Sequence, residues 1–519
     1  MTSVMVVLTY FISLFLIIVN INKYMHIFQQ SFYEIDEFLP AIKTTKSCKM
    51  QIYEVVLIAL AILSFFYPFI LFVYAITCIF IAYKTINNRP VAKKKFVYTN
   101  RVKITYCIIA ILLLLSIVGV YYLSNLKYIS VIYVTLSLYK LVSIVIMLIG
   151  NIIAQPLLKL FNLRYINEAK RIIKSNNKMK IIGITGSYGK TSTKNIVSAL
   201  LEEKYITVMT PKSYNTTLGV VKTIREQIKP YTEVFICEMG AARLGEIQEI
   251  CEIAKPDISV ITSIGPQHLE SFKTIENIIK TKFELYDSVN KNGGITFLNY
   301  DNEYLAKQNK SNTLAYGINN EKLDYNAYNL KSSSQGLSFS INNVDFKTKL
   351  IGRHNIVNIT GAIAVANYLE IPLDRLVPRV REFKSVEHRL QLISKGNLNI
   401  IDDAYNSNPV SSKSAIDTLS EFDGTKIIVT PGLIELGGDE EKYNFEFGEY
   451  MCDVCDYIFL VNSTISKYVL NGINSKKYNN DKIFMVNSPQ EAVMQITNFG
   501  LNDKITVLLE NDLPDNYNL

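Results

Sequence analysis

Four apolar stretches near the N-terminus constrain the fold more than any other feature of this 519-residue chain. They cover residues 4–19, 55–83, 104–123 and 129–153, and their lengths approach or exceed the roughly 20 residues that a membrane-spanning helix needs. The second stretch contains Pro68, so it is either one kinked helix or a re-entrant pair. We therefore predict an α-helical transmembrane region of about four spans over residues 1–160.

The first stretch could also be a signal peptide. It has no basic segment before it and no small-residue cleavage site after it, which favours an anchor that stays in the mature protein. Residues 20–51, which follow, mix charged and aromatic side chains and would form a short extracytoplasmic segment. The sequence assigns this segment no function.

The distribution of charge predicts the orientation of the spans. The net charge is +8, but residues 1–180 carry 20 Lys and Arg against 5 Asp and Glu, whereas residues 181–519 carry 34 against 41. Residues 84–103 and 156–180 are basic, so both segments are predicted in the cytoplasm, with everything after about residue 157. The predicted protein therefore crosses the membrane several times. Because its surplus of positive charge lies beside the apolar segments, we interpret that charge as membrane-facing and not as a nucleic-acid-binding surface.

The seven cysteines do not form a recognisable framework. Only Cys452 and Cys455 have C-x-x-C spacing, and no second pair or nearby histidine completes a zinc site. We interpret them as reduced cytoplasmic thiols, with a redox or metal pair as the alternative.

A phosphate-binding loop is predicted just after the membrane part. Lys180–Thr185 is a β-branched run, a helical pattern covers residues 192–203, and between them stands Gly186-Ser187-Tyr188-Gly189-Lys190-Thr191. In such a loop, backbone N–H groups and the helix N-terminus surround phosphates. Lys190 would reach the β- and γ-phosphates of a nucleotide, and the Thr191 hydroxyl would bind Mg²⁺. The general Walker spacing fails by one position, because Ile184 stands where its first glycine belongs.

Two later segments carry candidate metal-site residues. The buried-type strand Val234–Glu238 ends in a carboxylate, and the carboxyl end of a strand beside a phosphate loop is where a Mg²⁺ ligand belongs. A second strand over residues 258–264 leads to His268, and Lys282 follows in a helix. Because an ammonium group cannot ligate a metal, Lys282 by itself reads as an exposed helix lysine.

These segments together resemble one family. Thr185 to Thr191 is similar to the T-G-x-x-G-K-T loop of the Mur ligases, which form amide bonds on peptidoglycan precursors, and residues 238–240 resemble the E-M-G segment of that family. The resemblance implies two Mg²⁺ ions. The second would be bound by His268 and by Lys282, fourteen positions later, after CO₂ has converted the lysine into an anionic carbamate.

The resemblance also implies a nucleotide site and a substrate site. The G-x-H-N-x-x-N signature is matched by residues 352–358, which include His354 and place Asn355 or Asn358 against the adenine. Arg389, next to His388, would contact the ATP phosphates, and Asp403 would lie near the ribose. The implied nucleotide-binding residues are Thr185, Gly186, Ser187, Tyr188, Gly189, Lys190, Thr191, Ser192, Asn355, Asn358, Arg389 and Asp403; those for substrate are Asn215, Thr216, Asn406 and Asn408.

The predicted architecture has four parts. The transmembrane region (1–160) and a basic linker (161–177) precede a P-loop-type central α/β ATPase domain (178–384) and a C-terminal Rossmann-like α/β domain (385–519). The resemblance covers about residues 178–519. Together with the apolar stretches and the basic segments, it predicts a multi-pass protein of the bacterial cytoplasmic membrane whose catalytic domains bind ATP in the cytoplasm.

Within the family, residues 238–247, 264–270 and 402–409 most resemble the branch that adds D-alanyl-D-alanine to a muramoyl peptide. The uridine-nucleotide-binding domain of that branch is missing, Thr216 replaces a usual Asn, and the G-D-M start of the segment at residues 431–437 is lost. The predicted function is an ATP-dependent amide ligase that joins an amino acid or dipeptide to a muramoyl-peptide carboxylate. It would act beside the lipid bilayer and cell-wall synthesis proteins. The alternatives are a poly-γ-glutamate-type or other acid–amino acid ligase, and a non-catalytic nucleotide-binding membrane scaffold.

Overall fold

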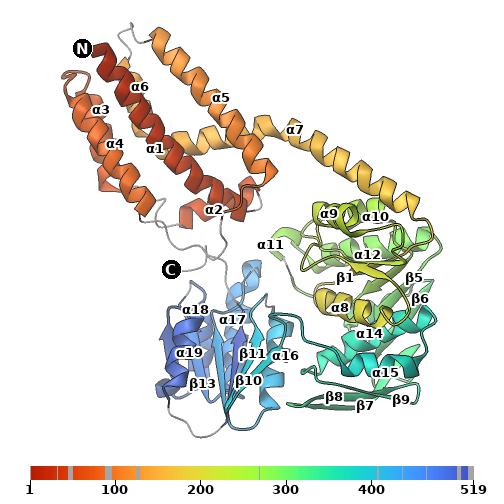
Figure 1. The fold of residues 1–519 in the computed structure, drawn as a ribbon. Helices are drawn as coiled ribbons and strands as arrows, with labels where there is room; N and C mark the ends of the chain where they lie inside the picture. The colour runs from red at the N-terminus through yellow and green to blue at the C-terminus, as the bar shows by residue number, and fades with distance from the viewer. Residues whose placement is uncertain are drawn as a thin grey trace. The chain divides into compact units, whose positions relative to one another are not determined.

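The computed structural model describes residues 2–31, 33–44, 51–87, 96–123, 129–267, 269–405, 408–434, 436–462, 464–499 and 504–511. The chain divides into two compact units, one ending at Leu163 and the other beginning at Arg164. The first unit is helical (Figure 1), and the second contains two sheets with helices packed on them.

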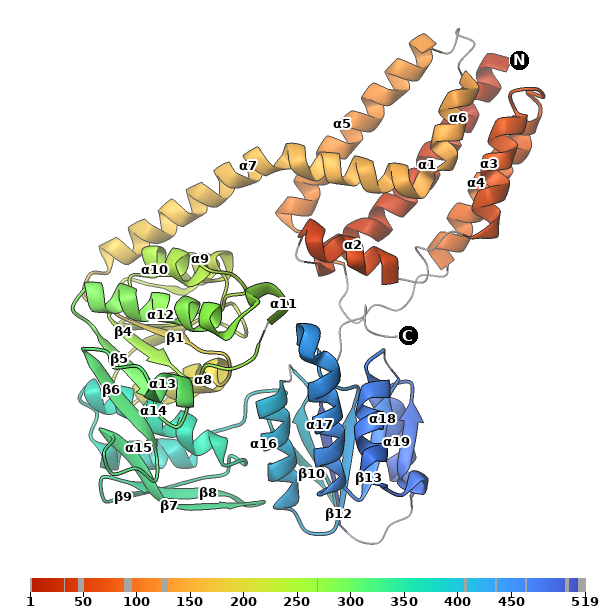
Figure 2. The ribbon, with the colours of Figure 1, turned by 180° about the vertical axis from the view of Figure 1, so that it is seen from behind.

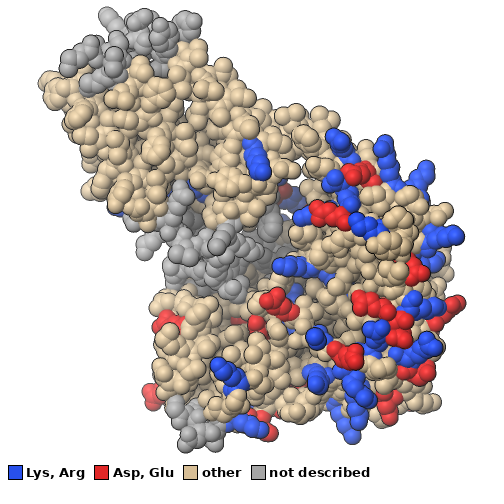
Figure 3. All heavy atoms as spheres, viewed as in Figure 1, with Lys and Arg blue, Asp and Glu red and all other residues tan. Residues whose placement is uncertain are grey.

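The helical unit contains most of the predicted apolar stretches. Its helices are α1 (Thr2–Gln30), α2 (Ile35–Thr44), α3 (Ile52–Leu63), α4 (Ile70–Asn87), α5 (Asn100–Leu123), α6 (Ile129–Ser137) and α7 (Tyr139–Ser175). By length and composition, four segments among the described residues could cross a membrane: Val6–Gln30, Ile70–Asn87, Asn100–Gly119 and Tyr139–Ser175. Figure 3 shows few charged side chains on the visible face of this unit.

Two of the apolar stretches are broken. The second forms α3 and α4, which run side by side (Figures 1 and 2). Pro68 lies in the turn, where its missing N–H and its ring prevent a continuous helix, so the alternative of a pair fits and that of one kinked helix does not. The fourth stretch divides at Leu138, between α6 and α7, although no proline or glycine announces the break.

The segment predicted as a basic linker is not irregular. Helix α7 continues through it to Ser175, and residues 161–175 therefore belong to a 37-residue helix. Pro156 lies inside this helix without ending it. From Tyr165 onward α7 packs with the second unit, where Ala169 and Ile173 are buried.

The first sheet forms the central α/β domain. Its order is β2-β3-β1-β4-β5-β6-β7-β8-β9. In this order, the seven strands from β2 through β1 to β7 pair in parallel. The last two strands, β8 and β9, extend the sheet by antiparallel pairing. The strands are β1 (Lys180–Thr185), β2 (Thr207–Met209), β3 (Val234–Glu238), β4 (Ile258–Ile261), β5 (Ile295–Asn299), β6 (Thr313–Ile318), β7 (Tyr325–Ser333), β8 (Gly336–Ile341) and β9 (Val344–Thr348).

Helices cover both faces of this sheet, which explains why its first strands are continuously apolar. On one face, Ile182 and Ile184 of β1 pack with α8 (Lys190–Leu201), α14 (His354–Tyr368) and α15 (Leu373–Arg381). On the other face, Ile181 packs with α9 (Thr217–Gln227), α10 (Glu246–Ala254) and α12 (Ile275–Lys291). The short helices α11 (Leu269–Phe272) and α13 (Glu303–Ala306) follow β4 and β5.

The second sheet forms the C-terminal domain, with the order β10-β11-β15-β12-β13-β14. Only β10 pairs antiparallel with its neighbour. The strands are β10 (Gln391–Lys395), β11 (Leu398–Asp403), β12 (Thr425–Thr430), β13 (Tyr457–Val461), β14 (Ile483–Val486) and β15 (Ile505–Glu510). One face packs on α16 (Pro409–Ser420), α17 (Glu440–Cys452) and α18 (Ser466–Ser475), and the other packs on α19 (Pro489–Thr497). In each sheet, the carboxyl ends of the parallel strands lie at the same edge of that sheet. Ligand sites of α/β proteins are found at such edges.

Candidate active site

The phosphate loop lies between β1 and α8, at the carboxyl edge of the central sheet. Two of its glycines are required by geometry. Gly186 has a φ of 149°, and a Cβ there would overlap Thr262 Oγ1. Gly189, with a φ of 80°, is the residue before α8, and a Cβ there would lie 2.8 Å from Asn358 Oδ1. A side chain at either position would be strained and would clash.

Lys190 folds back over this loop. Its Nζ donates to the carbonyl oxygens of Gly186 (2.6 Å) and Ser187 (3.0 Å). Desolvation in the cleft, reinforced by the charge of Arg389 and opposed by that of Glu238, lowers the pKa of Lys190 to about 8. A lysine ammonium over a glycine loop can exchange these carbonyls for phosphate oxygens.

The Thr191 hydroxyl and the Glu238 carboxylate meet at the end of β3. Thr191 Oγ1 donates to Glu238 Oε1 at 3.1 Å, and Asn215 Nδ2 donates to the same oxygen at 3.1 Å. The Glu238 side chain is buried, with 1% of its surface exposed. Three residues predicted from separate segments are therefore in direct contact.

This cluster fits a Mg²⁺ ion. Glu238 Oε2 is buried, makes no hydrogen bond within the described residues and lies 3.0 Å from the Lys194 ammonium, so a Mg²⁺ ion would share this carboxylate with Lys194. Mg²⁺ prefers oxygen ligands and is commonly bound by one or two carboxylates together with substrate phosphates. Among the residues that the structure describes, no three His, Cys, Asp or Glu side chains gather as a metal site. A site made of Thr191, Glu238 and phosphate oxygens needs no such group.

The segment that leads toward His268 is attached to the phosphate loop. Ser187 N donates to Ser263 O (2.8 Å), Tyr188 N donates to Ser263 Oγ (2.7 Å), and Tyr188 Oη donates to Pro266 O (2.9 Å). The Tyr188 ring fills the space where a side chain at Gly265 would stand. Tyr188, predicted as a nucleotide-binding residue, thus contacts protein groups on both sides. His268 itself lies outside the described residues.

Lys282 is buried, contrary to the exposed position that a helix lysine suggests. Only 2% of its surface is exposed, and within the described residues no acceptor or carboxylate is in contact with its Nζ, which lies 5.9 Å from the centre of the Phe272 ring. Desolvation, reinforced by the charge of Lys190, lowers the pKa of Lys282 to about 7. Burial therefore favours the neutral, nucleophilic form of this amine more than in a solvent-exposed lysine.

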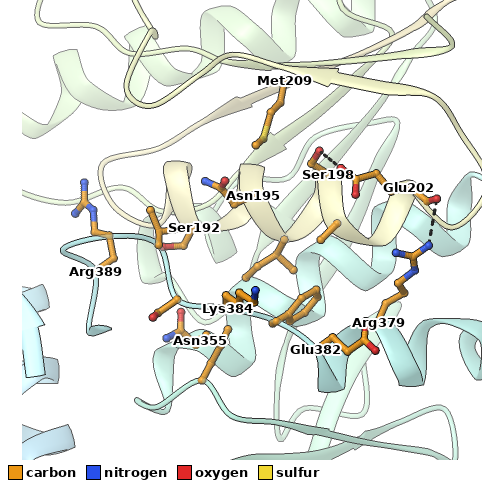
Figure 4. Close-up of a pocket in the computed structure, with 16 residues that line it drawn as sticks. Ser192, Asn195, Ser198, Glu202, Met209, Asn355, Arg379, Glu382, Lys384 and Arg389 are labelled. Carbon is orange, nitrogen blue, oxygen red and sulfur yellow. Dashed lines mark hydrogen bonds between the residues drawn. The ribbon is translucent and has the colours of Figure 1, made fainter. Parts of the chain in front are cut away.

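A cavity of about 340 Å³ lies beside helix α8. Its lining includes Ser192, Asn195 and Ser198 of α8 and Glu202 just after this helix, and Asn355, Lys384 and Arg389 from segments near it (Figure 4). Asn355 is buried and anchored to Ile351 O at 2.8 Å, so its side chain has a fixed place in the wall. Asn358 donates to Asn355 Oδ1 at 3.3 Å and does not line the cavity. Of the two asparagines, only Asn355 lines this cavity.

The start of the C-terminal domain brings the next predicted residues together. The Arg389 guanidinium stacks over the Tyr405 ring at 4.4 Å, and Asp403 Oδ1 accepts a hydrogen bond from Leu390 N at 3.1 Å. Burial raises the pKa of Asp403 to about 6, against the opposing charge of Arg389. His388 is held by Asp402, with Nδ1 2.8 Å from Oδ2.

The four predicted substrate residues have different surroundings. Asn215 contacts Glu238, and Thr216 precedes α9 without a side-chain cap bond. Asn408 is the N-cap of α16, with its Oδ1 accepting from Val410 N (3.1 Å) and Ser411 N (2.9 Å). Its carboxamide oxygen is therefore already used in the fold. Asn406 lies outside the described residues.

Comparison with known proteins identifies the family. Residues 184–366 match the Mur ligase middle domain, and residues 388–509 match the Mur ligase glutamate ligase domain. A protein of Buchnera aphidicola subsp. Acyrthosiphon pisum, named UDP-N-acetylmuramoyl-tripeptide–D-alanyl-D-alanine ligase, is 30% identical over 349 residues, which are 65% of this chain and 75% of that protein. This chain belongs to the Mur ligase family. The resemblance predicted from its sequence motifs is confirmed.

Two other relatives match this chain over fewer residues. The ligase of the same name from Bacillus subtilis is 32% identical over 286 residues, which are 54% of this chain and 62% of that protein. The one from Escherichia coli is 29% identical over 279 residues, 52% of this chain and 61% of that protein. This chain thus spans slightly less than two thirds of those two relatives. Neither matched family domain includes residues 1–183.

Solved structures agree on the α/β fold. The MurF ligase of Thermotoga maritima in complex with ADP has a TM-score of 0.60 and 26% identity, covering 68% of this chain and 80% of its own. MurF from Acinetobacter baumannii has a TM-score of 0.62 and 24% identity, covering 68% and 77%, and supports the fold alone. The predicted central and C-terminal α/β domains of a Mur ligase are confirmed.

Two observations add to the sequence interpretation of this Mur ligase. Lys194, one helical turn after Lys190, is fully buried beside Glu238, although nothing in its sequence context separates it from a surface lysine. The i to i+4 spacing from Lys190 was the one available signal, since it puts both side chains on the same helix face.

Cys452 and Cys455 are free thiols whose pKa values are raised by burial, to about 11 for Cys452, which favours inert thiols over a reactive pair.

Proposed function

We propose that this chain is an ATP-dependent ligase that joins D-alanyl-D-alanine, or a similar amine, to the carboxylate of a muramoyl-peptide precursor in peptidoglycan synthesis. The contact of Thr191 with Glu238 beside the Lys190 loop carries the proposal, because it supplies a cation site at the position of ATP phosphates. The choice of D-alanyl-D-alanine and a muramoyl peptide as substrates is supported by the names of the relatives. The catalytic residues are Lys190, Glu238, His268 and Lys282.

The reaction has two steps. A carboxylate oxygen of the acceptor attacks the γ-phosphorus of ATP, the bond to the β-phosphate oxygen breaks, and ADP leaves with that electron pair. The amine nitrogen then attacks the acyl carbon, inorganic phosphate leaves, and the nitrogen loses a proton. Lys190 and Arg389 stabilise the charge on the phosphoryl group, and binding both substrates together supplies proximity. No side-chain nucleophile is required.

The proposed cofactors are two Mg²⁺ ions and CO₂. Thr191 and Glu238 would hold the first ion, and His268 with carbamylated Lys282 the second; bound magnesium neutralises negative charge on the transferred phosphoryl group. The buried, weakly basic Lys282 amine supports the carbamate, since CO₂ reacts with a neutral amine and releases a proton. Carbamylation changes this residue from a cation into an anion.

The helical unit is proposed as a membrane anchor that replaces the uridine-nucleotide-binding domain. Four segments long and apolar enough to span support this, with the active site in the cytoplasm. One buried polar group fits a packed bundle: Glu54 Oε1 accepts from Tyr139 Oη at 3.0 Å and pairs with Lys140 Nζ at 2.5 Å. An enzyme fixed at the bilayer could act on a lipid-linked muramoyl peptide.

Phosphate release by the detergent-purified full chain tests the proposed ligase. ATP, Mg²⁺ and D-alanyl-D-alanine would be combined in turn with UDP-linked and lipid-linked muramoyl peptides, and ligation would be followed with labelled dipeptide. We expect phosphate release to require both the acceptor and the amine. Incorporation of glutamate instead of the dipeptide would favour the poly-γ-glutamate alternative, and release that depends on neither substrate would contradict a ligase.

Topology can be tested by reporter fusions. Fusions after residues 95 and 180 should both report the cytoplasm, because each follows a basic segment and α5 to α7 would cross the membrane an even number of times between them. Paired alkaline phosphatase and fluorescent protein fusions measure this directly. An external signal at residue 180 would put the nucleotide site on the wrong side for ATP.

A further inference from the structure

Lys194 is a buried cation that the proposed chemistry does not use. It lies on α8, one turn after Lys190, and its side chain has no exposed surface. Its Nζ is 3.0 Å from Glu238 Oε2 and donates to Lys212 O at 2.5 Å. A lysine is rarely fully buried unless it is paired, so this position is a built feature of the site.

The contacts of Lys194 join three segments. Glu238 ends β3, Lys194 belongs to the helix of the phosphate loop, and Lys212 lies in the loop of residues 210–216, which we call the substrate loop. That loop is also tied to β3 and the residues after it. Thr210 N donates to Ile236 O and Glu238 N to Thr210 Oγ1, both at 3.0 Å, and Gly240 N donates to Asn215 O at 2.8 Å. One ammonium group thus bridges the carboxylate of the metal site and the backbone of the substrate loop.

The geometry of the pair distinguishes it from an ordinary salt bridge. Glu238 Oε1 accepts hydrogen bonds from Thr191 and Asn215, whereas Oε2 faces the Lys194 ammonium without hydrogen-bond geometry. The ammonium therefore compensates the buried charge but leaves lone pairs on the carboxylate. An ammonium group at this distance offsets the cost of burying the carboxylate and fixes its orientation.

We propose that Lys194 is a positioning residue that orients the Glu238 carboxylate for Mg²⁺ and fixes the substrate loop to the same carboxylate. The proposal rests on the ligase function proposed above. In this proposal, two properties depend on the Lys194 side chain. One is the contribution of Mg²⁺ to nucleotide binding, and the other is the order of the substrate loop.

The test compares Lys194→Met, which keeps the length of the side chain, with Lys194→Gln, which keeps a neutral donor. Lys204→Met is the matched control, because Lys204 forms a half-exposed surface pair with Glu370. Calorimetric titration of the full chain gives the affinity for ADP with Mg²⁺ and with EDTA. In Lys194→Met the gain in affinity from Mg²⁺ should fall by about 10-fold or more, with Lys194→Gln intermediate and the control unchanged. An unchanged gain in Lys194→Met would overturn the proposal.

Amide hydrogen exchange measured by mass spectrometry tests the substrate loop without any nucleotide. Tyr214 N and Asn215 N donate within the loop, at 3.0 and 2.8 Å, so their exchange reports its order. We expect exchange over residues 210–216 to rise by about 10-fold in Lys194→Met while the strands of the central sheet stay protected. Faster exchange across the whole sheet in both variants would instead make Lys194 a core residue and overturn the proposal. Absence of any magnesium effect on wild-type ADP binding would contradict the ligase function, and the exchange result would still decide the role of Lys194 in the loop.

Discussion

Replacing Lys190 by alanine should abolish turnover while the protein still folds and, under the membrane anchor proposed above, still inserts into the bilayer. The side chain stands over the phosphate loop and, among the described residues, bonds to two backbone carbonyls. The loop conformation depends on Gly186 and Gly189, so removing the side chain should leave it intact. The transferred phosphoryl group would lose its nearest cation. Loss of one preorganised contact to developing charge costs about 100- to 1,000-fold in rate, and a full charge in a cleft should cost at least that.

The measurement is phosphate release at saturating ATP and Mg²⁺, with recovery in the membrane fraction and circular dichroism as checks on folding. Lys204→Ala, on a surface lysine just beyond α8, is the control and should retain turnover. Wild-type rates in Lys190→Ala would contradict the assignment of the nucleotide site. A loss of protein from the membrane fraction would show that the lysine also has a structural role.

The part of the fold that could be predicted is the part where local signals agree. The predicted strand Lys180–Thr185 has the observed bounds, and the strand predicted from Val234 begins where β3 begins and reaches the carboxylate Glu238, because each is a continuous apolar run. The strand predicted over residues 258–264 ends earlier, at Ile261. The helix after the loop was placed within two residues. The structure also brings Thr191, Glu238 and Asn215 into contact, as the shared edge of a parallel sheet predicts.

What could not be predicted depends on tertiary packing. The break at Leu138 has no proline or glycine signal, and α7 runs through residues whose charge alone suggested a linker. The antiparallel strands β8 and β9 end the sheet without a motif of their own. Lys194 and Lys282 are both lysines in amphipathic helices, which normally face water, and only the assembled sheet and loops show that each is buried.

Replacing Lys282 by alanine should lower turnover severely, whereas Lys280→Ala, an exposed lysine on the same helix, should have little effect. If Lys282 is a carbamate, the substitution removes a negative charge from a site for cations. Metal-ion stabilisation of the transition state is worth several kcal/mol, so a loss of about 100-fold or more is expected. An ordinary surface lysine would change stability by only about half a kcal/mol and leave catalysis intact.

The lowered pKa of Lys282 sets the condition for this chemistry. Because burial moves the pKa down to about 7, the neutral amine that attacks CO₂ prevails above that pH and is lost to the ammonium form below it. Protein equilibrated with ¹³C-labelled bicarbonate at pH 8 should show a carbamate carbon resonance that Lys282→Ala lacks and Lys280→Ala retains. Short carboxylic acids should restore part of the Lys282→Ala activity by entering the vacated space, and Lys282→Glu should keep some activity without CO₂. Near-normal turnover in Lys282→Ala would exclude the carbamate and leave the site of Lys190, Thr191 and Glu238 unaffected.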